Sequence, residues 1–136
     1  MKILAVFILA VTITIANAQF SFFSKTILKT QVYAAAGECG LREGASRDAI
    51  RDLKHGIFAD DDPNLKCFVD CVLDRLDFFV DGEINVDVIN EKVGSIIGME
   101  QLEAAMEKCN DIKGEDNCDT AYQLLKCYYS NKPPVL

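Results

Sequence analysis

Apolar residues recur along most of this chain at the three- to four-residue spacing of an amphipathic α-helix, and no segment shows sustained two-residue alternation. The clearest apolar stripe lies between Leu65 and Leu76, with Lys66, Asp70 and Asp74 on the opposite side. Turn and capping residues divide the chain into short pieces rather than one long helix. The pattern therefore predicts an all-α fold of six short helices.

Helix-capping residues set the expected bounds of these helices. Ser46, Asp62 and Asn85 are suitable N-caps, and Pro63 follows Asp62 at the first helical position. The expected helices run from Phe22 to Glu38, ending about Cys39-Gly40; from Ser46 to His55; from Asp62 to about Phe79; from Asn85 through Val93, after a turn at Asp81-Gly82; from the Gly94–Gly98 stretch to Lys113-Gly114; and from Asp116 or Asn117 to Pro133-Pro134.

The N-terminal segment has the features of a secretory signal peptide. Lys2 gives it a positive start, Ile3 to Ile15 is almost entirely apolar, and Ala16-Asn17-Ala18 supplies the small residues that a signal peptidase requires. The apolar run is too short to span a bilayer comfortably. We therefore expect residues 1–18 to be a signal peptide and residues 19–136 to form one secreted, extracellular domain.

Charge and composition argue against several classes of function. The formal charge is −7, and it becomes −8 when Lys2 leaves with the signal peptide, which suits neither nucleic acid nor an anionic membrane. The single histidine, His55, leaves little scope for catalysis or metal binding. The Asp77–Val88 segment does not fit a calcium loop, because Val88 stands at the twelfth position, where a ligand is required. We therefore expect no enzyme activity, no cofactor and no metal.

Six cysteines lie in the expected mature chain, with the spacing Cys39-x27-Cys67-x3-Cys71-x37-Cys109-x8-Cys118-x8-Cys127. An even number in an oxidising compartment indicates three disulfides. Cys67 and Cys71 share one helix and would not bridge each other, nor would Cys118 and Cys127, which leaves ten of the 15 pairings open. Three cross-links would hold short helices together even around an unfilled interior. A carrier with a cavity and a packed helical domain therefore both fit.

This cysteine spacing resembles that of the insect odorant-binding proteins, the pheromone- and general-odorant-binding family. The x3 gap and the final x8 gap both match, and the two long gaps fall in the family's range. Local sequence also resembles the family at Leu65–Cys71, at Asn117–Tyr122 and at Leu125–Tyr128. The similarity covers about Cys39 to Tyr129, and details such as Ile112–Glu115 resemble a subgroup from flies.

The resemblance implies a disulfide pairing and a set of cavity residues. Pairing of the first cysteine with the third, the second with the fifth and the fourth with the sixth gives Cys39–Cys71, Cys67–Cys118 and Cys109–Cys127. The family's cavity positions correspond to Val69, Leu73, Met106 and Tyr128, and helical phase adds Val32, Phe78, Val88 and Leu124. The implied fold is six short helices cross-linked by three disulfides around an apolar cavity.

The implied function is reversible binding rather than chemistry. We expect a secreted carrier, monomeric or weakly dimeric, that takes up a small hydrophobic ligand (an odorant, pheromone, fatty acid, aldehyde or ester), solubilises it and delivers it to a chemosensory receptor. Such a site would select chain length more than head group, with a hydroxyl of Tyr122, Tyr128 or Tyr129 bonding a ligand oxygen. The alternative is a secreted disulfide-linked helical protein without a small ligand, acting through its surface in immunity or reproduction.

Three features bear on release of the ligand by acid. The like-charged run Asp60-Asp61-Asp62 would relax on protonation, although a solvated turn that caps the next helix explains it better. His55 lies at an expected helix C-terminus, where its charge suits the helix dipole. The tail after Cys127, residues 128–136, would cover the cavity mouth but is too short to form a buried helix.

Overall fold

The computed structural model describes residues 2–131, and within its first helix the side chains at positions 3, 5, 6, 8 and 23–43. The elements, in chain order, are α1 (Lys2–Glu43), α2 (Arg47–Lys54), α3 (Pro63–Arg75), β1 (Phe79–Val80), β2 (Glu83–Ile84), α4 (Val86–Ile89), the π-helix η1 (Asn90–Gly94), α5 (Ser95–Ile97), α6 (Met99–Cys109) and α7 (Asn117–Asn131). With α4, η1 and α5 taken as one contiguous stretch, the described residues hold six helical segments. The all-α prediction is confirmed.

The predicted helix caps are present. Side-chain oxygens of Ser46, Asp62 and Asn85 accept hydrogen bonds from the backbone N–H three residues further on, at 3.1, 3.0 and 3.5 Å. Asp116 does the same for the first turn of α7, at 2.8 Å from the Asp119 N–H, so Asp116 rather than Asn117 caps this helix. His55 is the C-cap of α2, as its position predicts.

The predicted bounds of the first and fifth helices were wrong. The first helix begins at Lys2 rather than Phe22, and it passes Cys39-Gly40 to end at Glu43, because the glycine with left-handed backbone is Gly44 at φ 66°. Helix α6 ends at Cys109 instead of Lys113-Gly114. The backbone N–H groups of residues 114 and 115 donate to side chains at the start of α7, at 2.9 Å each, so this segment bonds to α7 and does not continue α6.

A short β-hairpin replaces the predicted end of the third helix. Helix α3 stops at Arg75, and β1 pairs antiparallel with β2, with Phe79 opposite Ile84. The turn is Asp81-Gly82, whose two residues have φ of 54° and 79°, the left-handed values that a tight two-residue hairpin requires. Strands of two residues are too short to show alternation in the sequence, so this hairpin was not predicted.

The fourth predicted helix is longer and less regular than expected. It continues beyond Val93 through the π-helical turn η1 and then α5, and it ends at Gly98, whose φ is 94°. A π-helical turn inserts a residue into the helix and shifts the face that each later side chain occupies. Simple helical spacing therefore assigns faces in this segment poorly.

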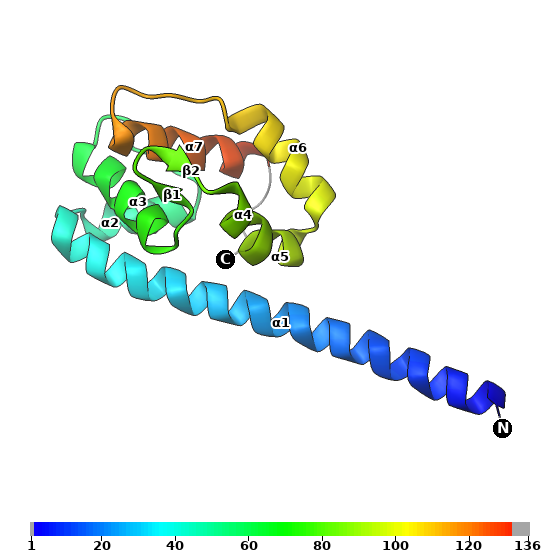
Figure 1. The fold of residues 1–136 in the computed structure, drawn as a ribbon. Helices are drawn as coiled ribbons and strands as arrows, with labels where there is room; N and C mark the ends of the chain where they lie inside the picture. Colours follow the sequence, from blue (N-terminus) through cyan, green and yellow to red (C-terminus); the bar gives the residue numbers. More distant parts are fainter. Residues whose placement is uncertain (1, 132–136) are drawn as a thin grey trace.

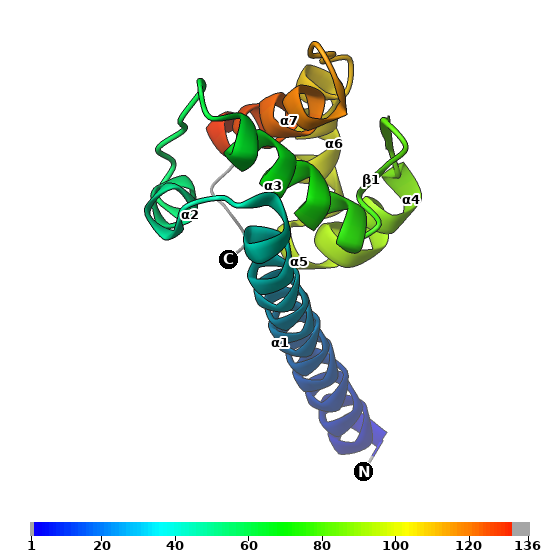
Figure 2. The same cartoon turned by 90° about the vertical axis from the view of Figure 1, so that its left-hand side faces the viewer.

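Helix α3 lies between α1 and α7 and contacts both along its length, as two views of the molecule show (Figures 1 and 2). The N-terminal part of α1 projects away from the rest of the fold (Figure 1). The main core cluster gathers around α3 and α7 and contains Cys39, Leu53, Leu65, Phe68, Val69, Cys71, Phe79, Ala121, Tyr122 and Leu124. A second set of buried residues lies outside this cluster, on α1, at the end of α3 and on α6: Leu28, Ala35, Leu76, Leu102, Ala105, Met106 and Cys109.

Candidate functional site

Three disulfides tie the helices around α3 and α7. Cys39–Cys71 joins α1 to α3, Cys67–Cys118 joins α3 to α7, and Cys109–Cys127 joins α6 to α7. This is the pairing that the family resemblance implies, and all six cysteines take part in it. The two cysteines of α3 lie one turn apart and reach two different helices, which fixes the position of α3 between them.

The eight predicted cavity residues fall into two groups in the structure. Val69, Met106 and Leu124 are buried, and Val69 and Leu124 belong to the main core cluster. The other five, Val32, Leu73, Phe78, Val88 and Tyr128, are only partly buried. Because full burial leaves no surface for a ligand, the partly buried group fits the predicted role better than Val69 and Leu124 do. Cavity lining stays a prediction for all eight.

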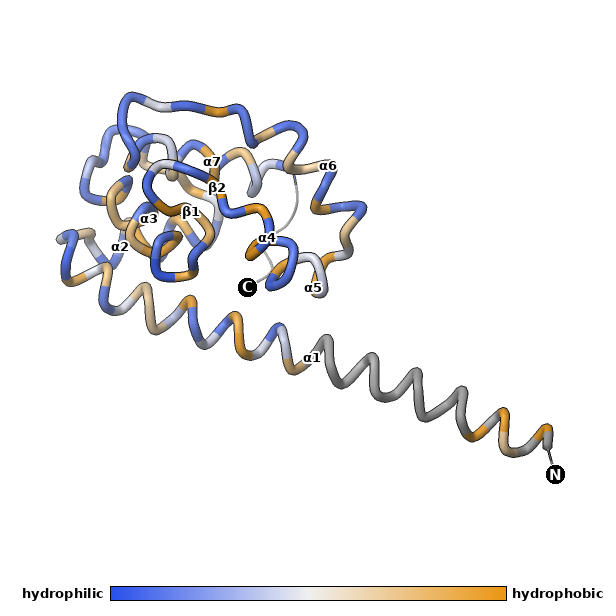
Figure 3. Tube along the Cα trace, in the orientation of Figure 1, coloured by the Kyte–Doolittle hydropathy of each residue, from blue (hydrophilic) through white to orange (hydrophobic). Residues whose placement is uncertain are grey.

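The segment 86–97 is an unusual apolar surface. Its twelve residues carry six large aliphatic side chains, Val86, Val88, Ile89, Val93, Ile96 and Ile97, and none of them is fully buried. The segment nevertheless contacts both α1 and α6, and Figure 3 shows hydrophobic positions on α4 and α6. Aliphatic side chains that remain accessible between packed elements are what the wall of a loosely filled interior would present.

Two hollows open on charged parts of the molecule, and neither is lined by any of the eight predicted residues. The first, of about 400 Å³, lies beside α7 and includes Asp60, Lys66, Asp119, Tyr122 and Lys126. The second, of about 380 Å³, lies between α1, the end of α3 and Lys92. Sequence reasoning missed both, because their walls combine charged residues that are far apart in the chain and carry no local motif.

At the first hollow, an ion pair and a hydrogen bond connect Asp60 to α7. Lys126 Nζ lies 2.9 Å from both carboxylate oxygens of Asp60, and the buried Tyr122 donates its hydroxyl to Asp60 at 2.9 Å. The hydrogen bonds from Lys126 and Tyr122 hold the pKa of Asp60 below its ordinary value. Asp62 of the same acidic run caps α3. The Asp60–Asp62 run is thus a turn anchored to α7, in line with the structural explanation favoured from the sequence.

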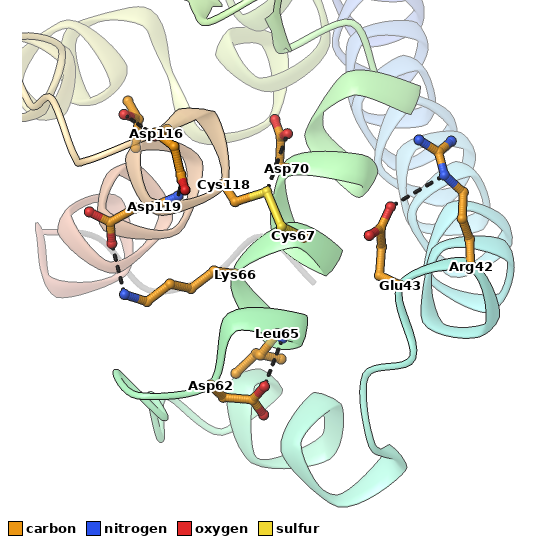
Figure 4. The surroundings of a disulfide bond; sticks show 11 residues. Arg42, Glu43, Asp62, Leu65, Lys66, Cys67, Asp70, Asp116, Cys118 and Asp119 are labelled. Atoms are coloured by element: carbon orange, nitrogen blue, oxygen red, sulfur yellow. Dashed lines mark hydrogen bonds and ion pairs between the residues drawn. A yellow bond between two sulfur atoms is a disulfide. The ribbon is translucent and has the colours of Figure 1, made fainter.

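Asp119 and Asp70 lie near the Cys67–Cys118 bridge (Figure 4), and their pKa values are shifted in opposite directions. Asp119 accepts from Lys66 Nζ at 2.9 Å and from the Glu115 N–H, and these bonds lower its pKa. Asp70 lies 3.9 Å from Cys118 Sγ, and burial, reinforced by nearby acidic groups, raises its pKa. One carboxylate therefore stabilises the fold when ionised, and the other opposes it.

The two carboxylates predict opposite effects of pH on stability. The pKa of Asp119 is lowered by folding, so its stabilisation is complete above the ordinary carboxyl pKa and is lost as pH falls through the lowered value. The pKa of Asp70 is raised, so its cost is complete at neutral pH and disappears on acidification. In urea unfolding at pH 7 we expect Asp119→Asn to lower the midpoint and Asp70→Asn to raise it, with both differences shrinking by pH 3. Equal shifts in the same direction would contradict this assignment.

Two of the three tyrosine hydroxyls singled out from the sequence already have protein partners. Tyr122 donates to Asp60, and the Tyr128 hydroxyl bonds the Asn110 side-chain oxygen. Burial raises the pKa of Tyr128 to about 12, so its hydroxyl stays protonated. The ring of Tyr129 packs edge-on against Phe58. Of these two bonded tyrosines, Tyr122 is buried and Tyr128 is only partly buried. The Tyr128 hydroxyl oxygen can still accept a hydrogen bond from a ligand.

Residues 2–131 offer neither a metal site nor a membrane span. This part of the chain contains no group of three or more His, Cys, Asp or Glu side chains placed to hold a metal ion. None of its helices combines the length and the apolar composition that crossing a membrane requires. Of the predicted tail, residues 128–131 form the last turn of α7, and residues 132–136 lie outside the described residues.

Fold and cross-links together define a small all-α protein in which three disulfides link α1, α3, α6 and α7. Residues 23–131 match the PBP/GOBP family, and the chain belongs to this family, as its cysteine spacing predicts. Membership supports a carrier of small hydrophobic molecules rather than an enzyme.

Individual relatives agree with this assignment. The chain is 47% identical over 70 residues to general odorant-binding protein 56a of Drosophila melanogaster, a match that covers 52% of this chain and only half of that relative. It is 32% identical over 100 residues to the B1 protein of Tenebrio molitor, covering 72% of this chain and 75% of the relative. Among solved structures, it resembles the fatty acid binding protein OBP56a from the oral disk of the blowfly Phormia regina, with a TM-score of 0.65, 31% identity, and 76% and 90% of the two chains covered.

Proposed function

We propose that this protein is a secreted carrier that reversibly binds small hydrophobic ligands with long hydrocarbon chains, fatty acids foremost, and delivers them to a chemosensory receptor. The observation that carries the proposal is the similarity to the blowfly fatty acid binding protein. The two chains are 31% identical, and the match covers 90% of the blowfly protein. Family membership over residues 23–131 supports the same class of ligand.

The apolar segment 86–97 supports a binding space inside the fold. Its six aliphatic side chains remain partly exposed, and the five partly buried predicted residues come from α1, α3, the loop before β1, α4 and α7. A hydrocarbon chain placed among them would bury surface that now contacts solvent. Burial of that surface on both ligand and protein favours binding.

The expected affinity follows from the length of the hydrocarbon chain. A ligand with about 12 buried methylenes gains on the order of 10 kcal/mol, and association removes at least about 4 kcal/mol. The remainder corresponds to micromolar or somewhat weaker dissociation constants. Binding of this strength allows both uptake and release.

Secretion is the second part of the proposal. Ile3 and Val6 are 73% and 66% exposed on the projecting part of α1, and large apolar side chains in such a position disfavour retention of this segment in a folded extracellular protein. We expect cleavage after Ala18, so that the mature chain begins at Gln19 and functions as a monomer or a weak homodimer.

Displacement of a fluorescent lipophilic probe from refolded residues 19–136 tests the binding proposal. We expect fatty acids, aldehydes and esters of 10 to 18 carbons to displace the probe at micromolar concentrations, with affinity rising about threefold to fourfold for each methylene that becomes buried. Absence of uptake across the whole series would refute the carrier and favour a protein that acts through its surface. N-terminal sequencing of the secreted protein tests the cleavage site.

A further inference from the structure

Lys92 of η1 is a partly buried cation without an ion-pair partner among residues 2–131. Its ammonium donates to the backbone carbonyl of Leu76 at 3.1 Å and lies 5.8 Å from the centre of the Phe78 ring. The six ion pairs of the described residues use other lysines and arginines. Within the described residues, two of the three N–H donors of Lys92 therefore have no protein acceptor.

Lys92 is one of the residues that line the second hollow, of about 380 Å³, and so is Leu76, whose carbonyl accepts the hydrogen bond from the Lys92 ammonium. One wall is the stretch of α1 from Gln31 to Glu38, and the opposite wall is the end of α3. Arg75 on that wall is paired with Glu38, so these two charges cancel. The charges left are Lys92 and the exposed Asp77, which makes no ion pair of its own within the described residues.

The hollow also adjoins residues predicted to contact a ligand chain. The centre of the Phe78 ring lies 5.8 Å from the Lys92 ammonium, and Val32 lies three residues before Ala35, which lines the hollow, on the same face of α1. Val32 shares the inward face of α1 with the buried Leu28 and Ala35, which lie four residues before and three residues after it. A hollow with a cation that makes no ion pair within the described residues thus meets an apolar wall, which is the arrangement that an amphiphile with an anionic head requires.

We propose that Lys92 binds the carboxylate of a fatty acid in this hollow, while the hydrocarbon chain runs inward past Phe78 and Val32. This rests on the proposed function and adds the head-group contact to it. A hydrogen bond between an ammonium and a carboxylate is charge-assisted and therefore stronger than a neutral one. The apolar chain still supplies most of the binding free energy, so chain length remains the main selector, with a preference for acids over esters added.

Asp77 is the group that opposes such a ligand, because its carboxylate lies on the same hollow. Its backbone has φ of 61°, a left-handed value that asparagine tolerates better than most other residues. Asp77→Asn therefore removes the charge without straining the chain. It supplies a variant whose expected effect has the opposite sign to the loss of Lys92.

The test measures binding of a 14-carbon fatty acid and of its methyl ester to refolded residues 19–136 at pH 7.5. Lys92→Gln should weaken binding of the acid about tenfold and leave the ester within twofold of the wild type. Asp77→Asn should strengthen binding of the acid about threefold, and Lys92→Arg should retain the preference for the acid. Lys108→Gln, which removes an exposed lysine of α6, is the control for net charge and should change neither ligand.

The outcomes separate this inference from the proposed function. If acid and ester weaken equally in Lys92→Gln, the residue only supports the end of α3 through Leu76, and the inference is overturned. It is also overturned if wild type and variant bind the acid alike while both ligands bind well, a result that leaves the carrier proposal standing. Failure of the wild type to bind either ligand overturns the carrier proposal itself.

Discussion

Replacing Cys67 and Cys118 together by alanine should lower the free energy of unfolding by about 4 kcal/mol. Because this disulfide closes the longest loop of the three, its removal should cause the largest loss. The bridge spans 51 residues and joins α3 to α7, and chain-entropy estimates rise with the length of the loop that a bridge closes. The shortest loop, between Cys109 and Cys127, spans 18 residues and corresponds to about 3 kcal/mol. Both cysteines of the longest loop are partly exposed, so their replacement leaves little cavity.

Urea unfolding of the oxidised proteins measures this effect and identifies its origin. If the bridge acts on the unfolded chain, the double variant exposes more surface on unfolding, and the slope of free energy against urea increases. Asp70→Asn, which changes the surroundings of the same bridge without removing it, is the control and should leave the slope unchanged. A loss below about 1 kcal/mol with an unchanged slope would show that the native helices hold together without this link.

Local sequence signals predicted the features that depend on a few neighbouring residues. Ser46, Asp62 and Asn85 cap the helices they were expected to cap, because an N-cap bonds the backbone three residues away and needs no distant partner. Helix ends that depend on distant contacts were missed. The end of α6 is set by bonds from residues 114 and 115 to α7, and the end of α3 is followed by a hairpin of two-residue strands.

In the candidate site, too, local sequence signals predicted some features, and those that depend on distant contacts were missed. Cysteine spacing predicted the family, which the match over residues 23–131 confirms. The family resemblance and helical phase gave candidate cavity residues, yet neither distinguishes a cavity wall from a packed core, and Val69 from the first source and Leu124 from the second are buried in the main cluster. Lys92 was not singled out at all, because its significance comes from Leu76 and Phe78, fourteen or more residues away in the chain.

A matched pair of substitutions distinguishes residues that line a cavity from residues packed in the core. Val32 on α1 is partly buried, whereas Val69 on α3 is 2% exposed within the main cluster. Val32→Phe should change the free energy of unfolding by less than about 1 kcal/mol, because the larger ring enters accessible space. Val69→Phe should cost about 1–3 kcal/mol, because a packed core has no room for it.

Ligand affinity should respond in the opposite order. A phenyl ring at Val32 would occupy the space of two or three ligand methylenes, each worth about 0.8 kcal/mol, so binding of a 16-carbon acid should weaken by at least tenfold. A 10-carbon acid, which needs less of the space, should be affected less. Probe displacement combined with thermal unfolding of both variants checks the pair. Strong destabilisation by Val32→Phe together with unchanged affinity would mean that the inward face of α1 is filled by the protein's own side chains, and that no ligand chain passes there.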